Sequence, residues 1–161
     1  MEWTGEIVIG ELRRTILAID PGEKVSGVVT FDVESGRVNF SDVMDNSDVL
    51  KLVAVSHFHE IAIEMIASYG MPVGREVFET CVWIGRFIQE SPDPAGVRLV
   101  YRKDVKSTLC GSAKAKDGNI RQALIDRLGK PGTKKDPGNT YGVKSHAWAA
   151  LAVAVVAAEE S

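Results

Sequence analysis

The chain has 161 residues, of which 45% are hydrophobic and 25% are charged, and its formal net charge is −3. This length favours a single domain covering residues 1–161, since domains commonly hold about 100 to 150 residues, and the composition excludes a largely disordered chain. The longest apolar run, 147–158, is shorter than the ~20 residues of a membrane span, so we expect no membrane contact. Two cysteines, Cys81 and Cys110, cannot form a disulfide framework, and we expect reduced thiols in a cytoplasmic protein.

The charge is distributed unevenly along the chain. The segment from Arg98 to Lys135 has 11 basic and 3 acidic residues, a net +8, whereas the remainder carries −11. This asymmetry favours a polyanion-binding face on an otherwise acidic body. A solvated pair of charged helices is the alternative, and charge alone does not separate the two.

The first half of the chain is typical of a sheet that begins with a hairpin. Residues 1–11 are treated as a loosely ordered leader. β-forming residues and a tight turn at 34–36 then predict three strands, at 15–20, 26–33 and 37–41. A short helix at 48–55 and a buried strand at 60–65 follow.

The second half of the chain is mainly helical. An apolar stripe predicts a helix at 74–89, and a strand is expected at 97–101. The next three helices are expected at 104–109, from a cap at Asp117 to Leu128, and from a cap at Ser145 to about Ala158. The last of these is apolar almost all round and should be buried. This order predicts an α/β fold, with a mixed sheet and helices on its faces.

Two carboxylates stand out at the ends of predicted strands. Asp20 ends an apolar strand and is followed by Pro21-Gly22, a turn that lets a phosphate or metal approach the backbone, although a turn-capping Asp is common. Glu64 lies between Ile63 and Met65, where an ionised carboxylate is costly unless it is paired or binds a metal. A strand-end Glu paired with Arg or Lys is the alternative for Glu64.

The histidines give weaker signals. His146 opens the last predicted helix, where it could be a metal ligand, a phosphate contact or a core residue, and its spacing alone favours the core. His57 and His59 have no third ligand at a fixed spacing, so we interpret them as surface residues.

Lysines and arginines with small residues between them make the basic segment a candidate surface for phosphates, since lysine contacts phosphate as a flexible point charge. The residues concerned are Lys103, Lys106, Lys114, Lys116 and Arg121.

Several short motifs occur in one order along the chain. They are Ile19-Asp20-Pro21-Gly22 with Gly27, then Ile63-Glu64, then Val105-Lys106 with Gly111 and Ala115-Lys116-Asp117, and finally the alanine-rich helix Ala150–Ala154. In this order and spacing the chain resembles the RuvC-type Holliday-junction resolvases, most closely their small phage-encoded relatives, over roughly Ile16 to Ala157.

The resemblance implies a ribonuclease-H-like fold and a homodimer that nicks four-way DNA junctions symmetrically with Mg²⁺. Asp20 and Glu64 match the first two acidic residues of the family, and His146 falls at the third acidic position, where some members have histidine. Lys106 matches the lysine that approaches the cleaved backbone. The fourth acidic position is Ala149, so Asp117, Asp136, water or DNA phosphate completes the sites, or one metal binds weakly. The order Lys116-Asp117 reverses the usual acidic-then-lysine pair.

The expected chemistry is metal-assisted phosphodiester hydrolysis. Two Mg²⁺ ions about 3.5 to 4 Å apart activate a water and stabilise charge on the phosphoryl oxygens, and carboxylates suit such hard cations. The imidazole of His146 favours Mn²⁺ somewhat. For the homodimer we expect a contribution from the helix at 74–89 through Phe78, Trp83 and Phe87, and Tyr69 or Met71 could wedge between bases at the junction centre.

Three alternatives stay open. The chain could be a ribonuclease-H-like nuclease for other branched or hybrid substrates, or a protein that binds branched DNA without cutting it because Ala149 marks a decayed metal site. A sugar-kinase or actin-like ATPase shares the strand–Asp–Gly opening, but no second glycine-rich phosphate loop follows and the chain is short for two such lobes.

Overall fold

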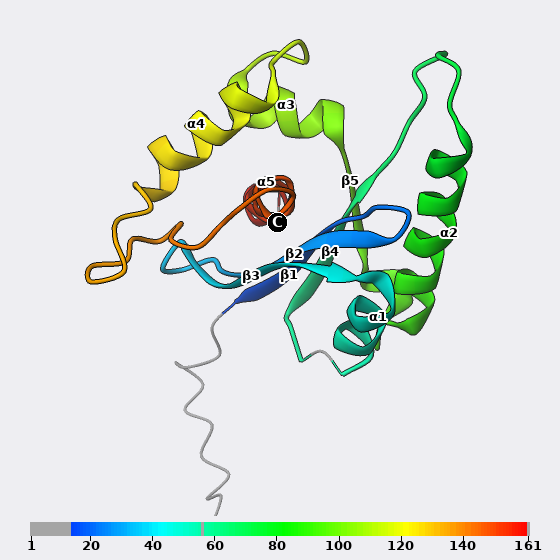
Figure 1. Ribbon diagram of the computed structural model, residues 1–161, viewed down its shortest axis with the longest axis horizontal. Coiled ribbons are helices and arrows are strands. Elements are labelled where there is room, and N and C mark those ends of the chain that lie inside the picture. The colour runs from blue at the N-terminus through cyan, green and yellow to red at the C-terminus, as the bar shows by residue number, and fades with distance from the viewer. Residues whose placement is uncertain (1–13, 56, 161) are drawn as a thin grey trace, which may run out of the picture.

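A five-stranded mixed sheet forms the centre of the molecule (Figure 1). The computed structural model describes residues 14–55 and 57–160, so the expected leader at 1–11 lies outside the described residues. The strand order is β3-β2-β1-β4-β5. The strands are β1 (Thr15–Asp20), β2 (Val25–Asp32), β3 (Arg37–Asp45), β4 (Glu60–Met65) and β5 (Arg98–Tyr101).

The first three strands form an antiparallel meander, as predicted. Gly36, at φ +68°, completes the turn between β2 and β3, a conformation that glycine adopts without steric cost. β3 continues to Asp45, beyond the expected end at Ser41, because Val43 and Met44 still pair with β2. Its mixed polar sequence conceals this pairing, since an edge strand is held mainly by backbone hydrogen bonds.

β4 and β5 extend the sheet in parallel fashion. β1 pairs with β4 in parallel register, and β4 pairs with β5 in the same way. Parallel neighbours place their carboxyl ends at one edge of the sheet, which is where ligands gather in α/β proteins. The ends of β1 and β4 therefore define the edge that is important for the site.

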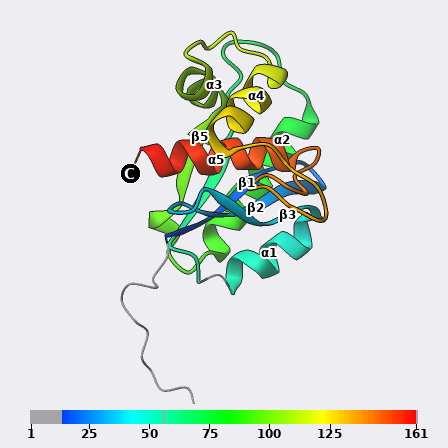
Figure 2. The same cartoon turned by 90° about the vertical axis from the view of Figure 1, so that its left-hand side faces the viewer.

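Helices cover both faces of the sheet (Figure 2). One face carries α1 (Asn46–Ala54) and α2 (Arg75–Glu90), and the other carries α5 (Ala147–Glu159), with α3 (Arg102–Cys110) and α4 (Asp117–Leu128) packed on top of it. A short 3₁₀ turn, η2 (Pro94–Gly96), precedes β5. This arrangement confirms the expected mixed sheet with helices on its faces.

Strand alternation divides the core into two clusters. Ile16 and Ala18 of β1 point to the α5 side, whereas Leu17 and Ile19 point to the side of α1 and α2. Among the described residues, no helix combines the length and the apolar character needed to cross a bilayer.

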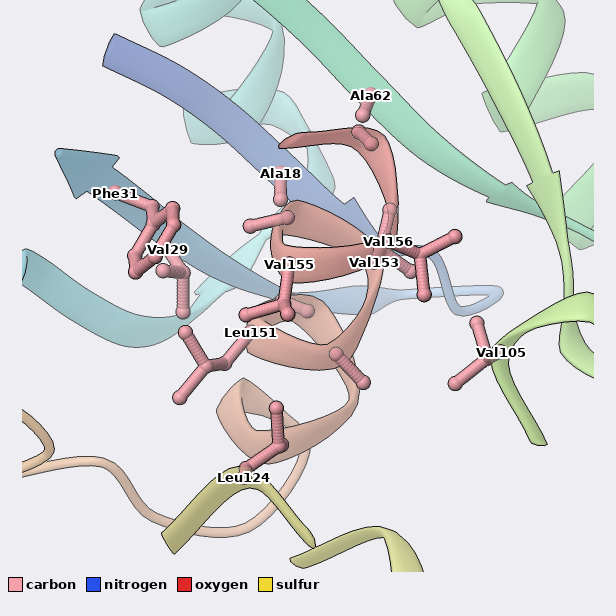
Figure 3. Close-up of a cluster of buried hydrophobic side chains, with 14 of the residues drawn as sticks. Ala18, Val29, Phe31, Ala62, Val105, Leu124, Leu151, Val153, Val155 and Val156 are labelled. Carbon is pink, nitrogen blue, oxygen red and sulfur yellow. The ribbon is translucent and has the colours of Figure 1, made fainter. Parts of the chain in front are cut away.

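Helix α5 is the most deeply buried helix of the described residues (Figure 3). Val153 and Val156 are fully buried in the cluster that also holds Val29 of β2 and Leu124 of α4. Because α5 touches the sheet on one side and helices on the other, it needs apolar residues all round, as its sequence predicted.

Two predicted caps are wrong. Helix α4 begins at Asp117 itself, and Lys116 holds the cap position, where its backbone N–H donates to Asn119 Oδ1 at 2.9 Å. The Ser145 side chain does not cap α5; Ser145 has φ +52° and contributes only its carbonyl oxygen, which accepts from the Trp148 N–H.

Candidate active site

Asp20 and Glu64 meet at the carboxyl ends of two adjacent strands. Ile19 pairs with Ile63 in the parallel register, so the residue after each stands at the same edge. Both carboxylates also lie on the α5 side of the sheet, the side to which Ala18 and Ala62 point. Their side chains are only 14% and 13% exposed. The predicted shared site requires the two carboxylates to lie close together, and they do.

The two carboxyl groups interact directly. Each carboxyl group lies close enough to the other to affect its ionisation. Burial, followed by the hydrogen bond to Asp20 and its charge, raises the pKa of Glu64 from 4.5 to about 8. Burial also raises the pKa of Asp20. Ionising both of these buried, neighbouring carboxyl groups is therefore unfavourable, and a bound cation would stabilise their ionised forms.

Arg102 is a basic partner that sequence reasoning missed. It is the first residue of α3, directly after β5, and its Nη1 lies 3.4 Å from Glu64 Oε1. Its Nη2 forms an ion pair with Oδ1 of Asp117, the first residue of α4. The alternative interpretation of Glu64, a strand-end carboxylate paired with Arg or Lys, therefore has its basic partner. This partner lies 38 positions further along the chain.

His146 stands at the cap position of α5, beside Asp20. Its Nδ1 is 3.4 Å from Asp20 Oδ2, and its side chain is 66% exposed, so the core position that its spacing favoured is wrong. Gly27 of β2 makes this placement possible, because a Cβ there would lie 2.4 Å from the His146 carbonyl oxygen. The start of α5 thus rests directly on the backbone of β2.

A small buried network fixes the turn after Asp20. The Gly22 N–H donates to Ser26 Oγ at 3.2 Å, Ser26 Oγ donates to Asn46 Oδ1 at 2.6 Å, and Asn46 Nδ2 donates to the Gly22 carbonyl at 2.8 Å. Ser26 and Asn46 are 1% and 2% exposed. Asn46 begins α1 and gave no signal in the sequence, because its partners are 20 to 24 positions away.

A hollow of about 260 Å³ opens beside the site. Its polar wall contains Arg102, Asp117, His146 and Arg121, the last stacked over the Trp148 ring at 4.9 Å. Ala149, where the resemblance expects an aspartate, also lines this hollow. The position where the resemblance expects a carboxylate therefore faces open space. Of the two aspartates considered as replacements, Asp117 lines the hollow and Asp136 does not.

The other predicted contact residues lie in the helical layer above α5 and in one loop. Lys103 and Lys106 are on α3, and Lys106 lies one turn after Arg102 on the same side of the helix. Tyr69 lies in the projecting loop between β4 and α2 (Figure 1), with φ +51° and 60% exposure. The remaining three are Lys114 and Lys116, exposed in the α3–α4 connection, and Arg121, exposed on α4.

Residues at the opposite end of β4 form a separate, structural cluster. Glu60, at the start of β4, is 13% exposed and is ion-paired with Arg14 at 3.2 Å and Arg98 at 3.3 Å. His57 and His59 are exposed and precede the same strand end, away from Glu64. This placement agrees with their interpretation as surface residues.

No protein-family model and no curated protein matches the sequence. The structure of RuvC from Thermus thermophilus matches with a TM-score of 0.67 and 18% identity, covering 88% of this chain and 92% of that chain. The chain has the RuvC fold. A second match, T. thermophilus RuvC in complex with Holliday junction substrate, has a TM-score of 0.64 and 18% identity over 89% of this chain and 92% of that chain.

The RuvC fold confirms the ribonuclease-H-like α/β architecture that the resemblance implied. Within this RuvC fold, Asp20, Glu64 and His146 come from β1, β4 and the start of α5 and converge on one edge of the sheet. The donor set of two carboxylates and one imidazole fits a divalent ion in kind. As the side chains stand, no group of three or more His, Cys, Asp or Glu within residues 14–55 and 57–160 could hold a metal ion.

Proposed function

We propose that this chain is a structure-specific endonuclease that depends on a divalent ion, Mg²⁺ or Mn²⁺, and resolves four-way DNA junctions by paired nicks. The observation that carries this proposal is the meeting of Asp20 and Glu64 at adjacent strand ends within the RuvC fold. A RuvC structure that matches this chain was determined with a Holliday junction substrate, which supports branched DNA as the substrate class.

Asp20, Glu64 and His146 are the residues that would hold the ion. When bound there, a divalent ion polarises the scissile phosphate and lowers the pKa of a water molecule. Asp20 and Glu64 contribute oxygen ligands from rigid strand ends, which limits their movement. His146 is largely exposed, so its ring can turn from Asp20 toward an incoming ligand.

Lys106 is the proposed catalytic cation on the DNA side. It is half-buried on α3, on the helix face that also carries Arg102. A lysine there would contact a phosphoryl oxygen and stabilise the negative charge that grows on it during cleavage.

The basic surface of the α3–α4 layer is the proposed DNA interface. Lys103, Lys114 and Lys116 are exposed there, and Arg121 reaches the hollow beside the site. These residues would position phosphates and carry little sequence information. Tyr69, exposed on the loop that follows Glu64, is proposed to stack on unpaired bases at the junction centre.

A homodimer is the proposed assembly, with α2 at its interface. Phe78 and Val82 are each 63% exposed and lie one turn apart on the outer side of α2. Of the residues expected there, Phe87 is fully buried and Trp83 packs against the same core, so these two belong to the fold rather than to a free surface. A two-fold dimer suits a junction because both have the same symmetry.

The decisive experiment is incubation with a mobile four-way junction whose strands are separately labelled. With Mg²⁺ or Mn²⁺ we expect paired nicks on opposed strands. Asp20→Asn and Glu64→Gln should abolish nicking and keep junction binding, because binding depends on the basic layer. Cleavage by either variant at the wild-type rate would overturn the site assignment.

A substrate panel separates the alternatives. Preferential cutting of flaps, forks or RNA–DNA hybrids would replace junction resolution by another ribonuclease-H-like activity. Tight junction binding with no cleavage under either metal would favour a non-catalytic binding protein, for which Ala149 in the wall of the hollow is the structural argument.

A further inference from the structure

A positive charge already stands among the acidic residues of the site. The guanidinium of Arg102 lies between Glu64, at 3.4 Å, and Asp117, with which it forms an ion pair. The Arg102 side chain is 30% exposed, and it lines the hollow next to His146 and Ala149. It therefore joins the carboxylate at the end of β4 to an acidic residue that lines the hollow.

The charge balance of these residues suits a single divalent ion. Asp20, Glu64 and Asp117, when ionised, carry three negative charges, and Arg102 reduces the total to two. One divalent ion neutralises this set. A second would leave an excess of positive charge at a site where Ala149 supplies no carboxylate.

We propose that Arg102 takes the place of a second metal ion, so that each chain binds one divalent ion and the guanidinium supplies the other positive charge. This inference rests on the proposed metal site. Arg102 suits the role because its planar fork of N–H donors can hold Glu64 and Asp117 and still present donors to a phosphate oxygen. A guanidinium also stays charged throughout the range in which enzymes work.

Arg98 shows what a purely structural ion pair looks like in this fold. Arg98 binds Glu60 at 3.3 Å, donates to the Ala157 carbonyl at 3.0 Å and lies 3.6 Å from Glu160, so its partners beyond β4 belong to the end of α5. Arg102, in contrast, has as its second partner Asp117, whose side chain is 86% exposed at the edge of an open hollow. A ligand can reach the Arg102 guanidinium from that side.

Mn²⁺ binding to the full chain, without DNA, tests this proposal. Isothermal titration calorimetry and electron paramagnetic resonance would count the bound ions at low ionic strength. The wild type should take up one Mn²⁺ per chain. Arg102→Gln should bind Mn²⁺ at least about tenfold more tightly, because a neighbouring positive charge has been removed, or take up a second ion. Arg102→Lys should restore the wild-type count and affinity.

Arg127→Gln is the matched control. Arg127 is also an arginine paired with a carboxylate, Glu159, but it lies at the far end of α4 and does not line the hollow. Its replacement should leave Mn²⁺ binding unchanged, and circular dichroism should show that all variants are folded.

The outcomes separate this inference from the proposed function. Two ions on the wild type, or Arg102→Gln with wild-type count and affinity, would overturn the role of Arg102 and leave the metal site standing. Absence of Mn²⁺ binding by the wild type would overturn the metal site itself and this inference with it.

Discussion

The conservative substitution Glu64→Gln should stabilise the metal-free protein at alkaline pH. The pKa of Glu64 rises from 4.5 in the unfolded chain to about 8 in the folded protein. The folded state therefore keeps a proton that the unfolded chain releases, and the free energy of unfolding falls as pH rises through the range between these two values. The contribution is fully present below pH 4.5 and lost above pH 8.

The magnitude follows from the same two values. One pKa unit corresponds to about 1.4 kcal/mol, so a rise from 4.5 to about 8 corresponds to about 5 kcal/mol at most. Water and side-chain rearrangement relieve part of this cost, and we expect Glu64→Gln to raise the free energy of unfolding by about 2 to 3 kcal/mol at pH 8.5. At pH 4 the effect should be small, because the wild-type carboxyl group is then largely protonated in both the folded and the unfolded protein.

Chemical denaturation in EDTA at both pH values measures this difference. Glu60→Gln is the matched control, since Glu60 lies on the same strand and face with the same 13% exposure. It has two arginine partners, Arg14 and Arg98, so its replacement should destabilise the protein at both pH values, by about 1 to 3 kcal/mol. If Glu64→Gln destabilised the protein at pH 8.5 as well, Glu64 would be a structural partner of Arg102 and the reasoning would fail.

Three further predictions concern DNA binding, the position of His146 and assembly. Charge reversal at Lys103, Lys106 and Lys114 together should weaken junction affinity and flatten its dependence on salt. Each phosphate contact contributes about −0.9 to the slope of log affinity against log salt concentration. Unchanged affinity in fluorescence anisotropy titrations would place the DNA on another surface. Gly27→Ala should lower the free energy of unfolding by about 1 to 3 kcal/mol and weaken Mn²⁺ binding, because the added Cβ would lie 2.4 Å from the carbonyl oxygen at the start of α5; thermal unfolding and calorimetry check both. Phe78→Asp should convert the proposed dimer to a monomer in sedimentation experiments, whereas a dimer of unchanged stability would remove the outer side of α2 from the interface.

The sequence predicted Asp20 and Glu64 as site residues because their positions at strand ends depend on residues next to them in the chain. Alternation along β1 and β4 places Asp20 and Glu64 on the same face as Ala18 and Ala62, and an apolar strand that stops at a polar residue marks an end. The convergence of the two carboxylates then needs only parallel pairing of these strands. The resemblance to RuvC-type proteins implied a mixed sheet, and the structure shows that β1 and β4 pair in parallel within it.

The features that the sequence did not predict depend on contacts between distant segments. Arg102 reaches Glu64 only because β5 lies beside β4. The residues near Glu64 in the sequence do not indicate this contact. The exposure of His146 depends on how α5 begins against Gly27, which no helical pattern encodes. Phe87 was expected at an interface because its helix is rich in apolar residues, but the tertiary packing buries it completely.

The stacked indole in the wall of the hollow has a practical consequence. Trp148 lies beneath Arg121 on one side of the sheet, and Trp83 lies beneath Arg86, at 4.0 Å, on the other. In a chain that carries Trp3→Phe, the molecule therefore holds two fluorophores with similar cationic neighbours and different surroundings. Emission from Trp148 should respond when a nucleic acid enters the hollow, and Trp83 provides an internal reference, so binding can be followed without any attached dye.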